Sequence, residues 1–142
     1  MRRLVAVLLA SAAVSAGVVS ALAARPADKA AAGPQIGHMV FFKLKDGTPD
    51  ARARLAGACK KYLANHDGTV YFSAGVIAPG FDQPVNDKDW DVALHLVFAD
   101  KAAHDKYQDH PKHKQFIEEN KDTWAKVRVF DSEIEPATGA GK

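Results

Sequence analysis

The chain of 142 residues contains a single cysteine, Cys59. One thiol cannot form an internal disulfide, so the fold must be stable without one. A bridge between two chains and a reactive thiol remain open as alternatives. The simpler interpretation, which we favour, is that Cys59 is a small apolar residue on the buried side of a helix.

Neither sign of charge is in excess once the first residues are set aside. Two of the 19 basic residues, Arg2 and Arg3, lie at the N-terminus, so without them 17 basic residues face 17 acidic ones. No stretch combines basic residues with interleaved aromatic residues, the pattern typical of nucleic-acid binding. We therefore expect no nucleic acid as a partner.

Common metal-binding motifs are absent as well. The sequence has no pair of cysteines and no HExxH motif. Acidic residues crowd residues 82–91, but without the regular ligand positions of a calcium loop. His104, His110 and His113 lie close in sequence, so a metal site there is an alternative, although Pro111 turns the backbone between the last two. We expect no metal and no cofactor.

The first 23 residues have the three parts of a secretory signal peptide. A basic start at Arg2 and Arg3 precedes an uncharged apolar run, and the segment ends in small residues up to Ala23. We expect cleavage after Ala23 and export to the periplasm or the medium, with no membrane contact afterwards. The run is about 20 residues long, enough to cross a bilayer, so an uncleaved anchor is the alternative.

The rest of the chain predicts one small domain with two flanking segments. Residues 24–37 are rich in alanine with Pro and Gly and predict a flexible tether, and residues 136–142 predict a disordered tail. The domain itself covers residues 38–135. A core of this size is marginal by itself, which favours oligomerisation.

Hydrophobic patterns within the domain predict four strands and two helical segments, the second of which is divided into two helices at Pro111. Thr48 and Asp100 are good N-cap residues, and alternation is clearest over residues 90–98. The expected strands are 38–44, 69–77, 90–98 and 127–135, and the expected helices are 49–64, 100–109 and 111–124. The order β-α-β-β-α-β predicts an α+β, ferredoxin-like fold, a four-stranded antiparallel sheet with its helices on one face.

The opposite face of this sheet carries too many apolar residues to remain in water. Six side chains are expected there: Met39, Phe41, Tyr71, Ile77, Val97 and Phe130. A second copy of the sheet would cover them, because two such faces can close into an α/β barrel. We therefore predict a homodimer, with His95 at its interface.

The segment from Tyr107 to Phe116 is the candidate functional site. Pro111 should end one helix near His110 and begin the next, which places His113 in a first turn. The positive end of the helix dipole there disfavours imidazolium and favours a neutral ring that can accept a proton. Histidines on the surface of a helix corner are the alternative.

Three motifs in this order resemble the stress-responsive dimeric α/β-barrel (Dabb) family. They are His38-x-Val40-x-Phe42-Lys43-x-Lys45-Asp46, Trp90-Asp91-x-Ala93-Leu94 and Tyr107-x-x-His110-Pro111-x-His113-x-x-Phe116. The resemblance implies a homodimer with a pocket between sheet and helices in each subunit. A plant polyketide cyclase of this family further implies His113 as catalytic base, Tyr107 as its phenol partner and His38 at the pocket edge.

The same resemblance implies an apolar pocket, but with a changed first helix. Where the cyclase has an aromatic residue and a tyrosine, this chain has Ala56 and Lys60, so the polyketide substrate is not implied. The expected binding residues are Val40, Phe42, Lys60, Leu94, Leu96, Phe116, Val127 and Val129.

Two functions remain open from the sequence. One is cofactor-independent acid-base chemistry of a lyase or cyclase type on a small, largely apolar carbonyl compound. The other is a stress-related dimer that binds a small ligand, or acts structurally, without catalysis.

Overall fold

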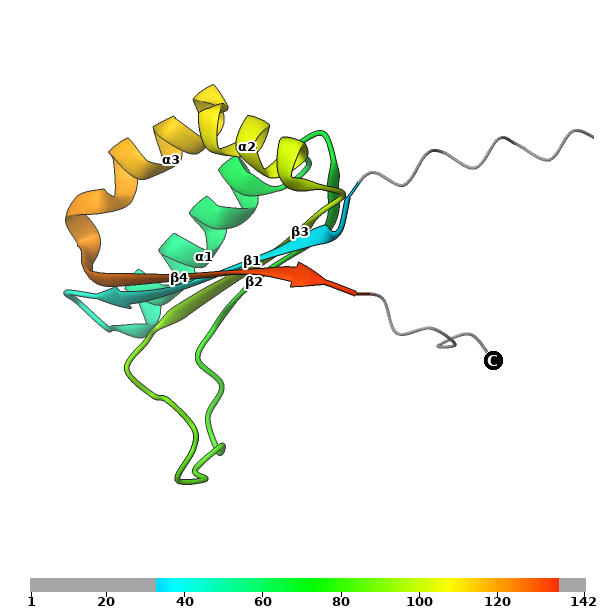
Figure 1. Ribbon diagram of the computed structural model, residues 1–142. Coiled ribbons are helices and arrows are strands. Elements are labelled where there is room, and N and C mark those ends of the chain that lie inside the picture. The colour runs from blue at the N-terminus through cyan, green and yellow to red at the C-terminus, as the bar shows by residue number, and fades with distance from the viewer. Residues whose placement is uncertain (1–32, 136–142) are drawn as a thin grey trace, which may run out of the picture.

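Strands and helices follow the predicted β-α-β-β-α-β order, with the second helical segment divided in two (Figure 1). The computed structural model describes residues 33–135. Its strands are β1 (Gln35–Leu44), β2 (Thr69–Val76), β3 (Val92–Phe98) and β4 (Trp124–Ile134), and its helices are α1 (Pro49–Leu63), α2 (Lys101–Asp109) and α3 (Pro111–Asn120), followed by the 3₁₀ turn η1 (Lys121–Thr123). The predicted signal peptide, most of the tether and the tail lie outside the described residues.

The four strands form one antiparallel sheet in the order β2-β3-β1-β4. All the helices lie on one face of this sheet, and the loop between β2 and β3 extends away from the opposite face (Figure 1). The predicted ferredoxin-like fold is therefore confirmed. Within residues 33–135, none of the helices has the length and apolar character needed to cross a membrane.

The predicted helix starts are confirmed at the level of single hydrogen bonds. The Thr48 hydroxyl accepts the backbone N–H of Ala51, and the Asp100 carboxylate accepts that of Ala103 at 2.8 Å. Each bond satisfies an N–H that has no partner within its own helix. Pro111 is the first residue of α3, where its missing N–H costs nothing.

The core lies between the helices and the sheet. On β3, the alternating side chains of Val92, Leu94, Leu96 and Phe98 are each at most 1% exposed. Cys59 on α1 faces them and is fully buried, which agrees with its interpretation as a core residue. Burial raises the pKa of its thiol to about 12, so it is not a reactive thiolate at neutral pH.

Strand β1 begins three residues earlier than expected, at Gln35 instead of His38. Gly37 weakens the sequence signal there, because glycine is unfavourable within a strand. In the fold, however, β1 is central and its first residues pair with both β3 and β4. A Cβ at position 37 would lie only 2.9 Å from a methyl carbon of Ile134, so the glycine permits this close approach.

The expected helix to residue 124 is too long, and β4 begins at Trp124 rather than Val127. The carbonyl of Thr123 already accepts the N–H of Lys45 at 2.9 Å, so the chain has joined the sheet at that point. The indole ring of Trp124 packs with its centroid 5.1 Å from that of Phe42. This aromatic packing overrides the helical pattern of the sequence.

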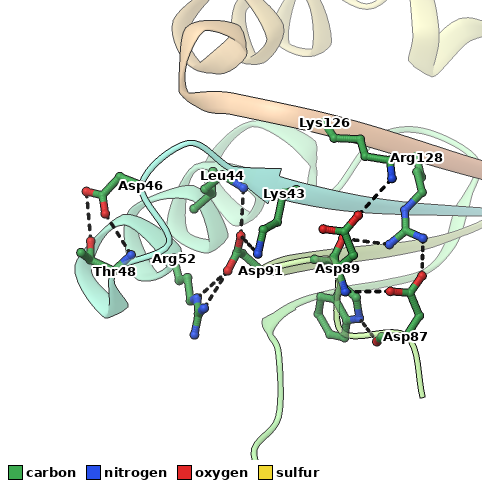
Figure 2. Close-up of polar contacts among 11 residues, drawn as sticks. Lys43, Leu44, Asp46, Thr48, Arg52, Asp87, Asp89, Asp91, Lys126 and Arg128 are labelled. Carbon is green, nitrogen blue, oxygen red and sulfur yellow. Dashed lines mark hydrogen bonds and ion pairs between the residues drawn. The ribbon is translucent and has the colours of Figure 1, made fainter. Parts of the chain in front are cut away.

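Strand β3, in contrast, begins two residues later than expected, at Val92, because the Asp91 carboxylate is a buried anchor. Its carboxylate accepts the N–H of Leu44 at 2.9 Å and pairs with Arg52 and Lys43 (Figure 2). Burial acts to raise the pKa of Asp91, but these hydrogen bonds outweigh it and hold the pKa below its usual range. Asp91 thus ties β3 to β1 and α1.

The loop before Asp91 is fixed to the far strand of the sheet. Asp87 pairs with Arg128 of β4, and Asp89 pairs with Lys126 at 3.0 Å (Figure 2). Trp90 packs against Phe41 on the open face, with ring centroids 5.4 Å apart. The last part of the loop therefore lies against that face.

The open face is apolar, as predicted. Met39, Tyr71 and Phe130 lie on the face without helices, where their side chains are 39%, 54% and 54% exposed. His95 faces the same way, with its Nδ1 3.2 Å from the Ser73 hydroxyl. Within residues 33–135, this large apolar surface is thus partly exposed to solvent.

Candidate active site

Tyr107 is the centre of the site that the structure assembles. It lies near the end of α2, is 2% exposed, and its hydroxyl has no hydrogen-bond partner among the described residues. Burial raises the pKa of this phenol, with a smaller contribution from Cys59. A buried hydroxyl without a partner is unusual in a folded protein and is a candidate for contact with a ligand.

His113 packs against Tyr107 from the first turn of α3. Their ring centroids are 4.6 Å apart, and Nδ1 of His113 lies 3.0 Å from the Gln108 carbonyl oxygen. A carbonyl only accepts, so Nδ1 carries the proton and Nε2 keeps a free lone pair. Burial lowers the pKa of His113 more than the bond to Gln108 raises it, which keeps the ring neutral.

His38 approaches Tyr107 from strand β1. It is 4% exposed, with its ring centroid 5.9 Å from that of Tyr107. Its Nδ1 lies 2.6 Å from Oδ1 of Asp131 on the neighbouring strand β4. Burial lowers the pKa of His38, and the contact with Asp131 offsets part of this effect.

His66 is a member of the site that sequence reasoning missed. It follows α1 in a turn that was predicted only as a helix stop, yet its ring centroid lies 5.1 Å from that of Tyr107. Its Nε2 donates to the Tyr62 carbonyl at 2.9 Å, and burial lowers its pKa. The turn is held against α2 by Gly68, where a Cβ would lie 2.4 Å from that of Ala103. Nothing local in the sequence signals that approach.

The imidazole rings of His38, His66 and His113 are held in the same way. Each directs one ring nitrogen to a fixed acceptor, which leaves the other nitrogen free to accept a proton. Each also has its pKa lowered by burial, so neutral bases surround the phenol of Tyr107. A hydrogen-bond donor among neutral bases is suited to proton transfer beside a carbonyl group.

A cavity of about 250 Å³ opens next to this cluster. Tyr107 and His66 line it together with His110, and Lys106 and Lys112 add two cationic side chains. His110 also caps α3, because its Nδ1 accepts the N–H of Lys112 at 3.1 Å. The cavity is therefore more polar than the pocket predicted from the sequence.

None of the eight predicted binding residues lines this cavity. Five of them are at most 5% exposed and pack on one another in the core, and none lines the cavity next to Tyr107: Val40, Phe42, Leu94, Leu96 and Phe116. Val127 and Val129 lie on the edge strand β4, where they pair with Phe42 and Val40 of β1 and are 38% and 50% exposed. Lys60 is exposed on α1.

The alternative metal set predicted from the sequence is not gathered in space. Among the described residues, His104, His110 and His113 do not form a metal-ligating group, and His110 instead packs on His66 with centroids 4.5 Å apart. His104 belongs to another group, with His38 and Asp131.

Comparison with known families gives a match over the whole domain. A family model described as "Stress Responsive A/B Barrel Domain" (Dabb) matches residues 36–134. Among curated proteins, no sequence matches the chain.

Solved structures share the fold. A Dabb family protein with a ferredoxin-like fold from Mesorhizobium loti is 26% identical, with a TM-score of 0.61, covering 72% of this chain and 99% of that one. A dimeric ferredoxin-like protein of unknown function from Thermobifida fusca is 21% identical (TM-score 0.59, 72% and 92% covered). The hydroxynitrile lyase of Passiflora edulis is 14% identical (TM-score 0.59, 72% and 95% covered).

Proposed function

Because this chain belongs to the stress-responsive A/B barrel (Dabb) family, we propose that it is an exported homodimer that binds a small carbonyl compound beside Tyr107. The compound is small enough for the cavity of about 250 Å³, and the histidines around Tyr107 move a proton on it. The reaction needs no cofactor and is of a lyase or cyclase type.

The unpartnered hydroxyl of Tyr107 is the observation that carries the proposal. A buried hydroxyl left without a hydrogen bond costs roughly 1–3 kcal/mol. A carbonyl oxygen of a ligand would accept this hydrogen bond and remove the cost. The phenol would then stabilise negative charge that develops on that oxygen.

His113 is the proposed base. Its Nε2 is free because Nδ1 is held by the Gln108 carbonyl, and its ring lies directly against Tyr107. A proton on the carbon next to the carbonyl would pass to Nε2, while Tyr107 holds the oxygen. Proton transfer of this kind contributes about 10²- to 10⁴-fold in rate, so positioning of the ligand must supply the rest. His38 packs against Tyr107 from strand β1 and supports the phenol from the side of the sheet.

Two further features support parts of the proposal. The apolar open face of the sheet favours a dimer, and several neighbours of similar fold are described as dimeric. A hydroxynitrile lyase with this fold supports the reaction class, although its 14% identity transfers no residue roles. Export rests on residues 1–23 of the sequence alone.

The test is an unbiased search for the ligand. The purified protein is exposed to metabolite extracts, and compounds that stay bound are identified by mass spectrometry. Binding and turnover are then compared for the wild type, His113→Ala and Tyr107→Phe, with Tyr62→Phe as a matched control in the same helical layer. We expect both site variants to lose turnover and the control to keep it.

Two outcomes would contradict the proposal. If the ligand binds equally to all variants and none turns it over, the site is a passive binding pocket. If nothing binds while the dimer is intact, the histidine cluster is structural.

A further inference from the structure

A second group of chemically active side chains lies beside the proposed site, where β1, α2 and β4 meet. It consists of His38, His104 and Asp131, one from each element. One ligand atom from each lies within 4.8 Å of the other two. Oδ1 of Asp131 is the shared point, 2.6 Å from Nδ1 of His38 and 3.9 Å from Nε2 of His104.

The ring of His104 is oriented so that its unprotonated Nε2 faces this group, where a metal ion would replace the Gln108 amide at the lone pair. Its Nδ1 lies 3.3 Å from a carboxylate oxygen of Asp105, which only accepts, so Nδ1 carries the proton. The side-chain amide of Gln108 lies 3.1 Å from Nε2 and donates to it. A carboxylate behind a histidine is the usual support for a metal-binding imidazole, because it fixes the ring and raises its basicity.

The group also has an open side. A cavity of about 310 Å³ is lined by His104 and Asp131, with Asp105, Ser132 and Glu133 around it. An open zinc site has three protein ligands and leaves space for water or a small molecule in the fourth position.

We propose that His38, His104 and Asp131 bind a divalent transition-metal ion such as Zn²⁺. Zinc bonds of about 2.0–2.2 Å place ligand atoms roughly 3–3.5 Å apart, and the two distances from Asp131 lie on either side of that value. Two imidazoles and one carboxylate select zinc and its neighbours over Mg²⁺ and Ca²⁺, which prefer oxygen ligands. The proposal does not depend on catalysis at Tyr107, although His38 contributes to both sites. Zinc binding at Nδ1 of His38 releases to solvent the proton that this nitrogen otherwise directs to Asp131.

The experiment measures metal binding directly. Untagged protein is freed of metal with a chelator, and Zn²⁺ is added in a calorimeter, with Co²⁺ absorption as a second readout of coordination. His104→Ala and Asp131→Asn remove one ligand each without touching Tyr107. His110→Asn is the matched control, because asparagine can still cap α3 but has no imidazole. Circular dichroism confirms that each variant is folded.

We expect one Zn²⁺ per chain, and no comparable binding of Mg²⁺ or Ca²⁺. His104→Ala and Asp131→Asn should weaken zinc binding by at least about 100-fold, and Asp105→Asn by about 10- to 100-fold, the usual loss for a supporting residue. His110→Asn should bind like the wild type. The absence of zinc binding by the wild type, or an equal loss in His110→Asn and His104→Ala, would overturn the assignment.

Discussion

Replacing Tyr107 by phenylalanine should make the protein more stable and less active. The substitution keeps the ring, which packs among Phe98, His66 and His113, and removes only the hydroxyl. That hydroxyl is buried and has no partner among the described residues, so its removal abolishes a cost of roughly 1–3 kcal/mol. Allowing for the packing lost with the oxygen atom, we expect a net gain of about 1 kcal/mol.

Chemical denaturation of the ligand-free protein measures this gain as unfolding free energy, and thermal unfolding measures it as a rise in Tm. For a domain of this size, about 1 kcal/mol corresponds to a rise of roughly 4–8 °C in Tm. Tyr62→Phe is the control, because the Tyr62 hydroxyl donates to Glu119 at 2.5 Å and its loss should lower stability. If Tyr107→Phe is instead less stable than the wild type, the hydroxyl has a structural partner and the reasoning fails.

Three further predictions concern the rest of the chain. Asp91→Asn should cost about 2–3 kcal/mol of unfolding free energy, because it removes a buried charge that anchors β3, and a loss below 0.5 kcal/mol in denaturation would contradict this. Burial lowers the pKa of the three histidines around Tyr107 in the folded state, so the unfolded chain takes up protons first as the pH falls. The unfolding free energy should therefore be highest above about pH 6.5 and decrease as the pH falls below that value. A Tm that does not change from pH 8 to 5.5 would refute this. Val97→Asp should convert a dimer into a less stable monomer in sedimentation, and an unaffected variant would show that the open face is covered in another way.

The elements that the sequence predicted correctly are those whose signals are local. The alternation from Val92 to Phe98, the caps at Thr48 and Asp100, and the proline at position 111 each act within a few residues. Because these signals need no distant partner, the fold follows from them.

The site was predicted only in part because its contacts are distant in sequence. Tyr107 and His113 are six residues apart, and the turn at Pro111 brings them together. His38 and Asp131 are 93 residues apart and meet only through the pairing of β1 with β4. His66 reaches Tyr107 through a glycine turn packed on α2, which no local pattern encodes.

The predicted binding residues illustrate a different limit. Periodicity correctly placed Val40, Leu94 and Phe116 on the helix side of the fold, but it cannot distinguish a filled core from an open pocket. That distinction depends on the volumes of all the side chains that meet there.

Deuterium exchange is the most direct test of the proposed proton transfer. The compound recovered from the binding experiment is incubated in heavy water with the wild type, with His113→Ala and with no protein. The account predicts deuterium at the carbon beside the carbonyl with the wild type, and only the uncatalysed rate with His113→Ala. Equal exchange with both proteins, or none above the uncatalysed rate with either, would contradict it.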